Sequence, residues 1–246
     1  MDRDLALRVF SCIDNTTLNA TDSDASVAAF CRRTVELGKP SVAAVCVYPR
    51  FVATAKSVLA GSGIKVASVA GAFPHGQLPI ELKVAEVKYA IASGADEIDM
   101  VLSRGSMLAG DYDTVRNEVA AMKEACSGRT LKVILETGEL SPTLIVKASQ
   151  LTIDGGADFI KTSTGKIAVG ATLETAELML NVVKEKVKFN KKSIGFKAAG
   201  GIRTPEEALA YAEMAKKIVG DNYINNQTFR IGASRLTESL YSLLTF

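Results

Sequence analysis

The sequence predicts an α/β protein that folds as a single (β/α)8 TIM barrel. Short apolar runs rich in β-branched residues alternate with longer segments in which apolar residues recur every three or four positions. There are eight such pairs, so the 246 residues give about 31 residues per unit, which suits one strand with its helix. Strict alternation indicates a parallel sheet covered by helices, and eight units favour closure of that sheet into a barrel.

Eight short apolar runs are the expected strands. In chain order they span residues 11–16, 42–47, 65–69, 96–101, 131–136, 158–162, 194–198 and 229–232. Helical segments follow them; for example, Leu173, Ala176, Leu180 and Val183 recur at steps of 3, 4 and 3. An open doubly wound sheet is the alternative, but its GxGxxG turn is missing, since residues 11–19 contain no glycine. No Pro/Ser-rich linker divides the chain, so we expect one catalytic domain over residues 1–246.

Composition excludes several classes of protein. The 29 Lys and Arg residues nearly balance 27 Asp and Glu, which argues against a nucleic-acid or polybasic membrane partner. A single histidine, His75, excludes His-rich zinc sites. The four cysteines form no CxxC pair, so we interpret them as free thiols in a reducing compartment. We find neither a signal peptide nor an apolar stretch near the ~20 residues that span a bilayer, and expect a cytoplasmic protein.

A weak internal repeat relates two of the expected strands. Residues 94–99 read Gly-Ala-Asp-Glu-Ile-Asp, and residues 156–161 read Gly-Ala-Asp-Phe-Ile-Lys. The repeat places Asp99 and Lys161 at the same height in the fourth and sixth strands. Because alternate strands of such a barrel contribute to the same interior layer, these two side chains are expected to face each other.

Three strands carry a charge within an apolar or small-residue run, namely Asp99, Lys161 and Lys197. Charged side chains are rarely buried without partners, so each alone would be interpreted as a strand end that reaches water. All three, however, lie near the carboxyl ends of their strands, which is the face that carries the active sites of barrels. We therefore interpret them as candidate catalytic residues.

The two lysines have a specific chemical consequence. Neighbouring strands lie ~4.8 Å apart, so the two ammonium groups on the sixth and seventh strands can approach each other. Burial and a like charge both favour the neutral amine, whereas an ordinary lysine with a pKa of ~10.4 is only ~0.04% neutral at pH 7. A neutral amine attacks carbonyl groups and forms a Schiff base, and Asp99 would then move protons.

A phosphate site is expected where the seventh and eighth strands end. Gly200 and Gly201 precede a helix start at 204–207 (Thr-Pro-Glu-Glu), and Gly232 and Ser234 precede the last helix. Loops after these two strands often bind phosphate in this fold. The run 162–166 (Thr-Ser-Thr-Gly-Lys) adds hydroxyls, the Gly165 amide and the Lys166 cation; it is no P-loop, because position 160 is not glycine.

Six motifs together resemble a known family. They are residues 14–18 (Asp-Asn-Thr-Thr-Leu), 46–51 (Cys-Val-Tyr-Pro-Arg-Phe), 73–76 (Phe-Pro-His-Gly), 94–99, 158–165 (Asp-Phe-Ile-Lys-Thr-Ser-Thr-Gly) and 195–197 (Gly-Phe-Lys). In this order, from about residue 10 to residue 240, the chain resembles deoxyribose-phosphate aldolase.

The resemblance implies a class I aldolase that uses neither a metal nor an organic cofactor. The implied reaction is the reversible cleavage of 2-deoxy-D-ribose 5-phosphate into acetaldehyde and D-glyceraldehyde 3-phosphate, in the cytoplasmic breakdown of deoxynucleosides. By motif position, Lys161 is the Schiff-base lysine, Lys197 the second lysine that tunes it, and Asp99 the acidic member of the proton relay. The implied partners are phosphosugar and aldehyde substrates. Whether the chain forms a homo-oligomer is left open by the resemblance.

Two positions depart from the family pattern, and other functions stay open. Ala198 stands where the family commonly has proline, and Arg235 follows Ser234 where a second serine is common. The alternatives are another Schiff-base aldolase or transaldolase, a phosphosugar isomerase that uses Asp99 as its base, and a non-catalytic phosphosugar-binding barrel. Only the aldolases are expected to give a borohydride-stable adduct on a lysine.

Overall fold

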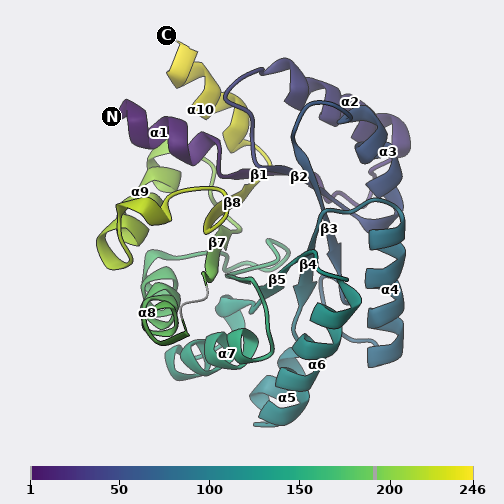
Figure 1. The fold of residues 1–246 in the computed structure, drawn as a ribbon, viewed down its shortest axis with the longest axis vertical. Coiled ribbons are helices and arrows are strands. Elements are labelled where there is room, and N and C mark those ends of the chain that lie inside the picture. Colours follow the sequence, from purple (N-terminus) through teal and green to yellow (C-terminus); the bar gives the residue numbers. More distant parts are fainter. Residues whose placement is uncertain (1, 191–192, 246) are drawn as a thin grey trace.

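The computed structural model describes residues 2–190 and 193–245, and it has the predicted closed barrel (Figure 1). Eight parallel strands pair in chain order, and the last pairs with the first. The strands are β1 (Ile13–Thr16), β2 (Ala44–Val47), β3 (Lys65–Ala70), β4 (Glu97–Val101), β5 (Thr130–Ile134), β6 (Phe159–Lys161), β7 (Gly195–Ala199) and β8 (Phe229–Ala233). The termini of the predicted domain, positions 1 and 246, lie outside the described residues, as do 191 and 192.

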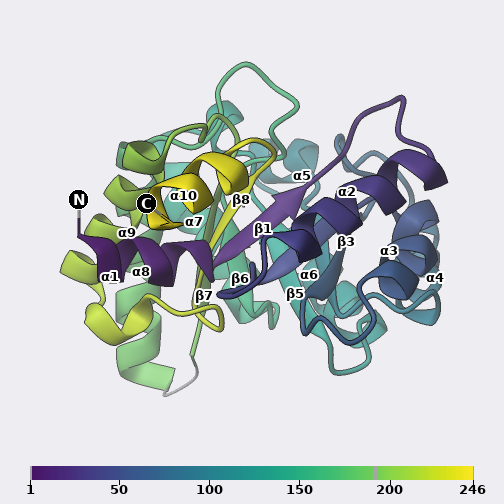
Figure 2. The ribbon, with the colours of Figure 1, turned by 90° about the horizontal axis from the view of Figure 1, so that it is seen from above.

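Helices surround the ring of strands on all sides (Figure 1). They are α1 (Arg3–Phe10), α2 (Asp24–Glu36), α3 (Val52–Val58), α4 (Ile80–Ala92), α5 (Arg104–Leu108), α6 (Tyr112–Ala125), α7 (Pro142–Asp154), α8 (Leu173–Asn190), α9 (Pro205–Ile218) and α10 (Leu236–Thr245). Figure 2 shows α1 beside α10, so the first and last helices pack together at one edge of the barrel. The Arg3 guanidinium donates to the carbonyl of Leu244 at 2.7 Å there.

The strands of the structure begin or end one or two residues away from the expected bounds, and two of these differences have a local cause. Helix α1 precedes the first strand and holds Ser11 in its last turn, so β1 begins at Ile13 rather than at residue 11. Strand β5 ends at Ile134, two residues early, because Glu136 turns into the left-handed region at φ 57°. Both differences arise where a local turn competes with an apolar run that would otherwise continue as a strand.

The barrel has two buried layers of different character. The larger one lies between the strands and the helices and is apolar. The smaller one lies inside the ring and contains Leu18, Ala44, Cys46, Ala67 and Val69. All four cysteines, which fall within the described ranges, are buried free thiols. Among the helices described, none has the length and apolar content needed to cross a bilayer.

Candidate active site

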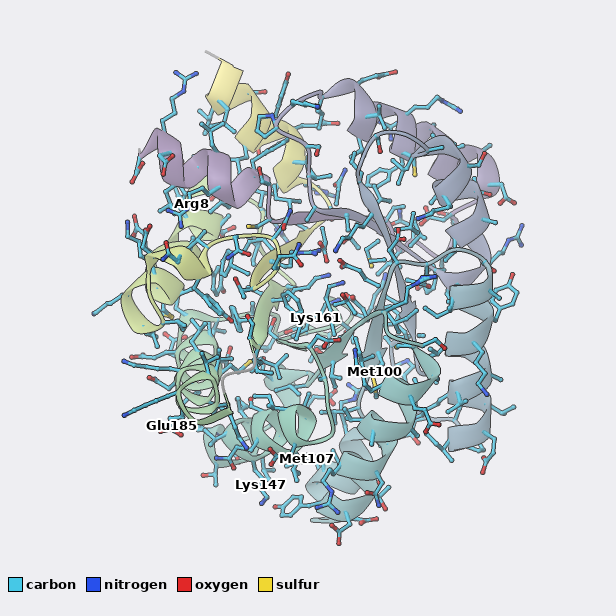
Figure 3. All side chains as sticks on the ribbon, in the orientation of Figure 1. Arg8, Met100, Met107, Lys147, Lys161 and Glu185 are labelled. Carbon is cyan, nitrogen blue, oxygen red and sulfur yellow. The ribbon has the colours of Figure 1, made fainter. Side chains whose placement is uncertain are left out.

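Seven charged side chains lie buried in the barrel interior. Their side chains are at most 5% exposed, and we call them the charge cluster: Asp14, Glu97, Asp99, Lys132, Lys161, Lys197 and Arg230. They share the inner face because successive side chains of a strand alternate between its two faces. Met100, next to Asp99 on β4, accordingly packs in the outer apolar layer, whereas Lys161 lies within the ring (Figure 3).

The structure brings the three predicted catalytic residues together. One carboxylate oxygen of Asp99, Oδ2, accepts from Lys161 Nζ and from Lys197 Nζ, both at 2.7 Å. Lys161 and Lys197 are directly paired in the register of β6 and β7. The repeat therefore located the Asp99–Lys161 contact correctly, and strand adjacency located the lysine pair.

The cluster separates the protonation behaviour of the two lysines. Burial, together with the cation of Lys197, lowers the pKa of Lys161 from its ordinary value, although Asp99 acts in the opposite direction. Burial also acts against the charge of Lys197, but the carboxylates of Asp14 and Asp99 outweigh it and raise the pKa of Lys197. Of the two lysines, Lys161 therefore loses its proton more easily, and Lys197 is the one that stays an ammonium.

Four members of the cluster were not predicted from the sequence: Asp14, Glu97, Lys132 and Arg230. Lys132 Nζ lies 2.8 Å from Asp99 Oδ1 and 2.5 Å from Glu97. Arg230 contacts Glu97 at 2.8 Å and Asp14 at 2.5 Å. The sequence does indicate three of these interior positions. Glu97 lies two positions before Asp99 and so shares its strand face, and Lys132 and Arg230 each interrupt an apolar strand. These charges lie deeper in the barrel than a search of strand ends would consider.

A cavity of about 350 Å³ opens beside Lys161. All six residues predicted to bind substrate or phosphate line it, namely Gly165, Lys166, Gly200, Gly201, Gly232 and Ser234. Of the described residues that line this cavity, none is acidic and four are cations: Lys161, Lys166, Arg203 and Arg235. The departure at Arg235 thus adds a positive charge to the site. Such a lining suits a small anionic ligand.

Helix α9, which begins next to this cavity, has the expected N-terminal capping box. Thr204 Oγ1 accepts from the backbone N–H of Glu207, and the Glu207 carboxylate accepts from the N–H of Thr204, with Pro205 as the first helical residue. Gly200 and Gly201, just before this helix, have φ values of 88° and 89°, a left-handed conformation that favours glycine. The loop can therefore present its backbone to the cavity.

The β6–α8 loop (residues 162–172) packs closely between two other loops. A Cβ on Gly170 would lie 2.2 Å from the carbonyl oxygen of Gly200, so only glycine fits at position 170. The next residue, Ala171, donates its N–H to the carbonyls of Ala199 and Gly200. On its other side, a Cβ on Gly138 would lie 2.5 Å from a backbone oxygen of the same loop. The loop is thus fixed by backbone contacts.

Glu136 ties the same loop to its neighbours. Its buried carboxylate accepts from both the backbone N–H and the hydroxyl of Thr164. It also lies 3.7 Å from the guanidinium of Arg104, which donates in turn to the carbonyls of Pro74 and His75. Arg104 and Glu136 therefore connect the loops that follow β3, β4, β5 and β6.

Known proteins share this fold and sequence pattern. A family model described as DeoC/LacD family aldolase matches residues 8–237. A Caenorhabditis elegans protein assigned as a deoxyribose-phosphate aldolase is 45% identical over 96% of this chain and 80% of its own length. Among solved structures, a protein of the same assignment from Coccidioides immitis superposes with a TM-score of 0.84 at 31% identity, over 97% of this chain and 86% of that one. Tetrameric deoxyribose phosphate aldolase from Aeropyrum pernix has a TM-score of 0.77 at 27% identity, over 99% of this chain and 98% of that one. With the match covering nearly all of its length, this chain belongs to the DeoC/LacD family of aldolases.

Proposed function

We propose that the protein reversibly cleaves 2-deoxy-D-ribose 5-phosphate into acetaldehyde and D-glyceraldehyde 3-phosphate through a Schiff base on Lys161. The observation that carries the proposal is the position of Lys161 Nζ. It is held by Asp99 beside Lys197 and lines the cationic cavity at the same time. The relatives whose assignments name this activity support the choice of substrate.

The chemistry follows from a free amine in this position. Lys161 Nζ attacks the aldehyde carbon of the open-chain sugar, and loss of water leaves a protonated imine. Removal of the proton from the C3 hydroxyl breaks the C2–C3 bond, and the imine accepts the electron pair as an enamine. D-Glyceraldehyde 3-phosphate leaves at this step. Protonation of the enamine carbon and hydrolysis of the imine release acetaldehyde and regenerate the amine.

Two other residues would move these protons. Asp99 contacts the reacting nitrogen of Lys161 at 2.7 Å, and the same oxygen of Asp99 contacts Lys197 Nζ at 2.7 Å. Because the surrounding lysines outweigh its burial, the pKa of Asp99 stays well below its ordinary value, so Asp99 is a carboxylate in the resting enzyme. Lys197, an ammonium that shares this Asp99 oxygen with Lys161, would then donate a proton to the carbinolamine, and Asp99 keeps both lysines in place.

The phosphate would occupy the end of the cavity between β7 and β8. Gly200, Gly201, Gly232 and Ser234 precede the first turns of α9 and α10, where backbone N–H groups and the helix dipole favour an anion. Arg203 and Arg235 add charge at the rim. Gly165 and Lys166 would contact the middle of the sugar from the opposite loop.

The wider setting follows from the same proposal. The chain acts as one catalytic domain, without a metal or organic cofactor, in the breakdown of deoxynucleosides in the cytoplasm. The near-neutral net charge of +2 supports small-molecule rather than nucleic-acid or membrane partners. The tetramer named for the Aeropyrum pernix relative supports self-association of this chain as well.

Borohydride reduction in the presence of acetaldehyde tests the mechanism directly. Mass spectrometry of peptides should find an added ethyl group on Lys161, and Lys161→Met should stay unlabelled. Labelling of Lys166 or Lys197 instead would overturn the assignment of the nucleophile. No adduct at all, with substrate still bound or isomerised, would favour the phosphosugar isomerase or the binding protein.

A further inference from the structure

The charge cluster contains more basic groups than acidic ones. Three carboxylates, Asp14, Glu97 and Asp99, face four bases, namely Lys132, Lys161, Lys197 and Arg230. Buried charges are costly unless each is compensated by a partner of opposite sign. The cluster is neutral only if one of the four bases is uncharged.

Contacts within the cluster determine which base that is. Arg230 contacts two carboxylates, Lys197 contacts two, and Lys132 lies within 4 Å of all three. Lys161 contacts only Asp99, through the oxygen that it shares with Lys197. The base with the fewest carboxylate partners loses its proton at the lowest free-energy cost, and that base is Lys161.

We propose that Lys132 is a positioning residue that keeps Lys161 unprotonated, because it supplies the third buried cation that the three carboxylates require. The inference rests on the proposed function, in which Lys161 must be a free amine. Lys132 does not line the substrate cavity and acts through Asp99, whose Oδ1 it occupies at 2.8 Å. Without it, a protonated Lys161 would itself complete the balance of three cations against three carboxylates.

The other groups around the cluster leave this balance unchanged. From β2, burial raises the pKa of the Cys46 thiol to about 11, so Cys46 is neutral at pH 7. From the helix side, burial raises the pKa of Cys126 near Lys132 to about 12. Strand β3 contributes Ala67 and Val69 to the interior. Glu136, buried at the barrel mouth, lies 3.7 Å from Arg104, a cation that it shares with Glu139 and that is not part of the cluster.

Lys65 provides a matched control. Its Nζ lies 3.0 Å from Glu97, much as that of Lys132 does, but its side chain is 38% exposed. Water and salt screen such a charge, so its removal should change the balance of the buried groups little. Lys65→Met therefore removes the same charge and the same kind of side chain as Lys132→Met, with a different expected result.

The experiment measures the rate of borohydride trapping of acetaldehyde on Lys161 as a function of pH. In Lys132→Met, the apparent pKa of the reactive amine should rise by about one unit or more, so that the trapping rate falls about tenfold or more at pH values well below this pKa and is regained at alkaline pH. Lys132→Arg and Lys65→Met should keep the profile of the wild type. The double variant Lys132→Met/Glu97→Gln removes one charge of each sign and should return the profile to that of the wild type.

Each outcome decides the inference. A lower rate in Lys132→Met with an unchanged pH profile would mean that Lys132 is merely structural. A double variant as shifted as the single one would overturn the argument from charge balance. If circular dichroism shows that Lys132→Met does not fold, the double variant and Lys132→Arg carry the test, and a shifted profile in either refutes the proposal. Failure of wild-type Lys161 to form an adduct would instead refute the proposed function.

Discussion

Gly170 offers a sharp test of how the β6–α8 loop supports substrate binding. In Gly170→Ala the new methyl carbon would lie 2.2 Å from the carbonyl oxygen of Gly200 and 3.0 Å from its Cα. Ordinary contacts are near ~3.5 Å, and the obstructing atoms are backbone, so the loops must separate by about 1 Å. The N–H of Ala171 would lose its two carbonyl partners.

This separation should weaken phosphate binding more than amine chemistry. Displacement of a binding group by about 1 Å can reduce turnover by about 10²-fold, and we expect a loss of that order in kcat/KM for the phosphorylated sugar. Overpacking should also cost about 1–3 kcal/mol of stability. Trapping of acetaldehyde on Lys161 should persist, because Lys161 is anchored in β6 by Asp99.

The assay compares Michaelis curves, borohydride trapping and thermal unfolding of Gly170→Ala with those of a control, Gly105→Ala. A Cβ at Gly105 would meet nothing within 4 Å, and the residue lies in helix α5. The control should keep full activity and gain up to about 1 kcal/mol of stability. Wild-type kcat/KM in Gly170→Ala would refute the view that this loop is held against Gly200 for substrate binding.

Three further predictions address charge. Ser234→Asp places a carboxylate in the proposed phosphate site and should raise KM for the phosphorylated sugar at least about tenfold, or ~1.4 kcal/mol, with much less effect on 2-deoxyribose; equal effects on both sugars would contradict it. Lys161→Met removes the surplus base of the charge cluster, so it should abolish activity yet raise Tm by about 2–4 °C in a thermal scan, and a lower Tm would count against the argument. Although burial opposes it, the surrounding cations lower the pKa values of Asp14 and Asp99, and that of Glu97 to about 2. Groups whose pKa is lower in the folded state contribute stability that is lost on acidification. The free energy of unfolding should therefore fall by up to about 4 kcal/mol per pH unit between pH 4 and pH 2. A free energy of unfolding that does not change over this range would be inconsistent with ionised carboxylates in the cluster.

Much of the fold was predictable because its signal is periodic. Alternating apolar runs predicted eight strands, and the repeat predicted that Asp99 and Lys161 meet. Both inferences use only spacing along the chain and the layer rule of barrels. The cap at Thr204 was predictable for the same reason, since a capping box is local.

The rest depends on contacts between residues far apart in the chain. Arg230 reaches Asp14 on the neighbouring strand β1 and Glu97 on β4 across the barrel, over 216 and 133 positions of sequence. No local pattern marks that pairing, although the charges themselves are visible in the strands. The requirement for glycine at position 170 likewise arises from Gly200, thirty positions away, and local propensity carries no trace of it.

The connection made by Arg104 and Glu136 bears on how such a barrel can be modified. Loops of this fold are often treated as modules that can be exchanged one at a time on a constant scaffold. Here the carboxylate of Glu136 holds Thr164, and Arg104 holds the carbonyls that follow β3. Grafting any one of these four loops removes a hydrogen-bond or charge partner from a buried group in another. The four loops that follow β3 to β6 should therefore be exchanged together. In recombination of related enzymes, crossover points before β3 or after the β6–α8 loop should give folded proteins more often than crossover points between these loops.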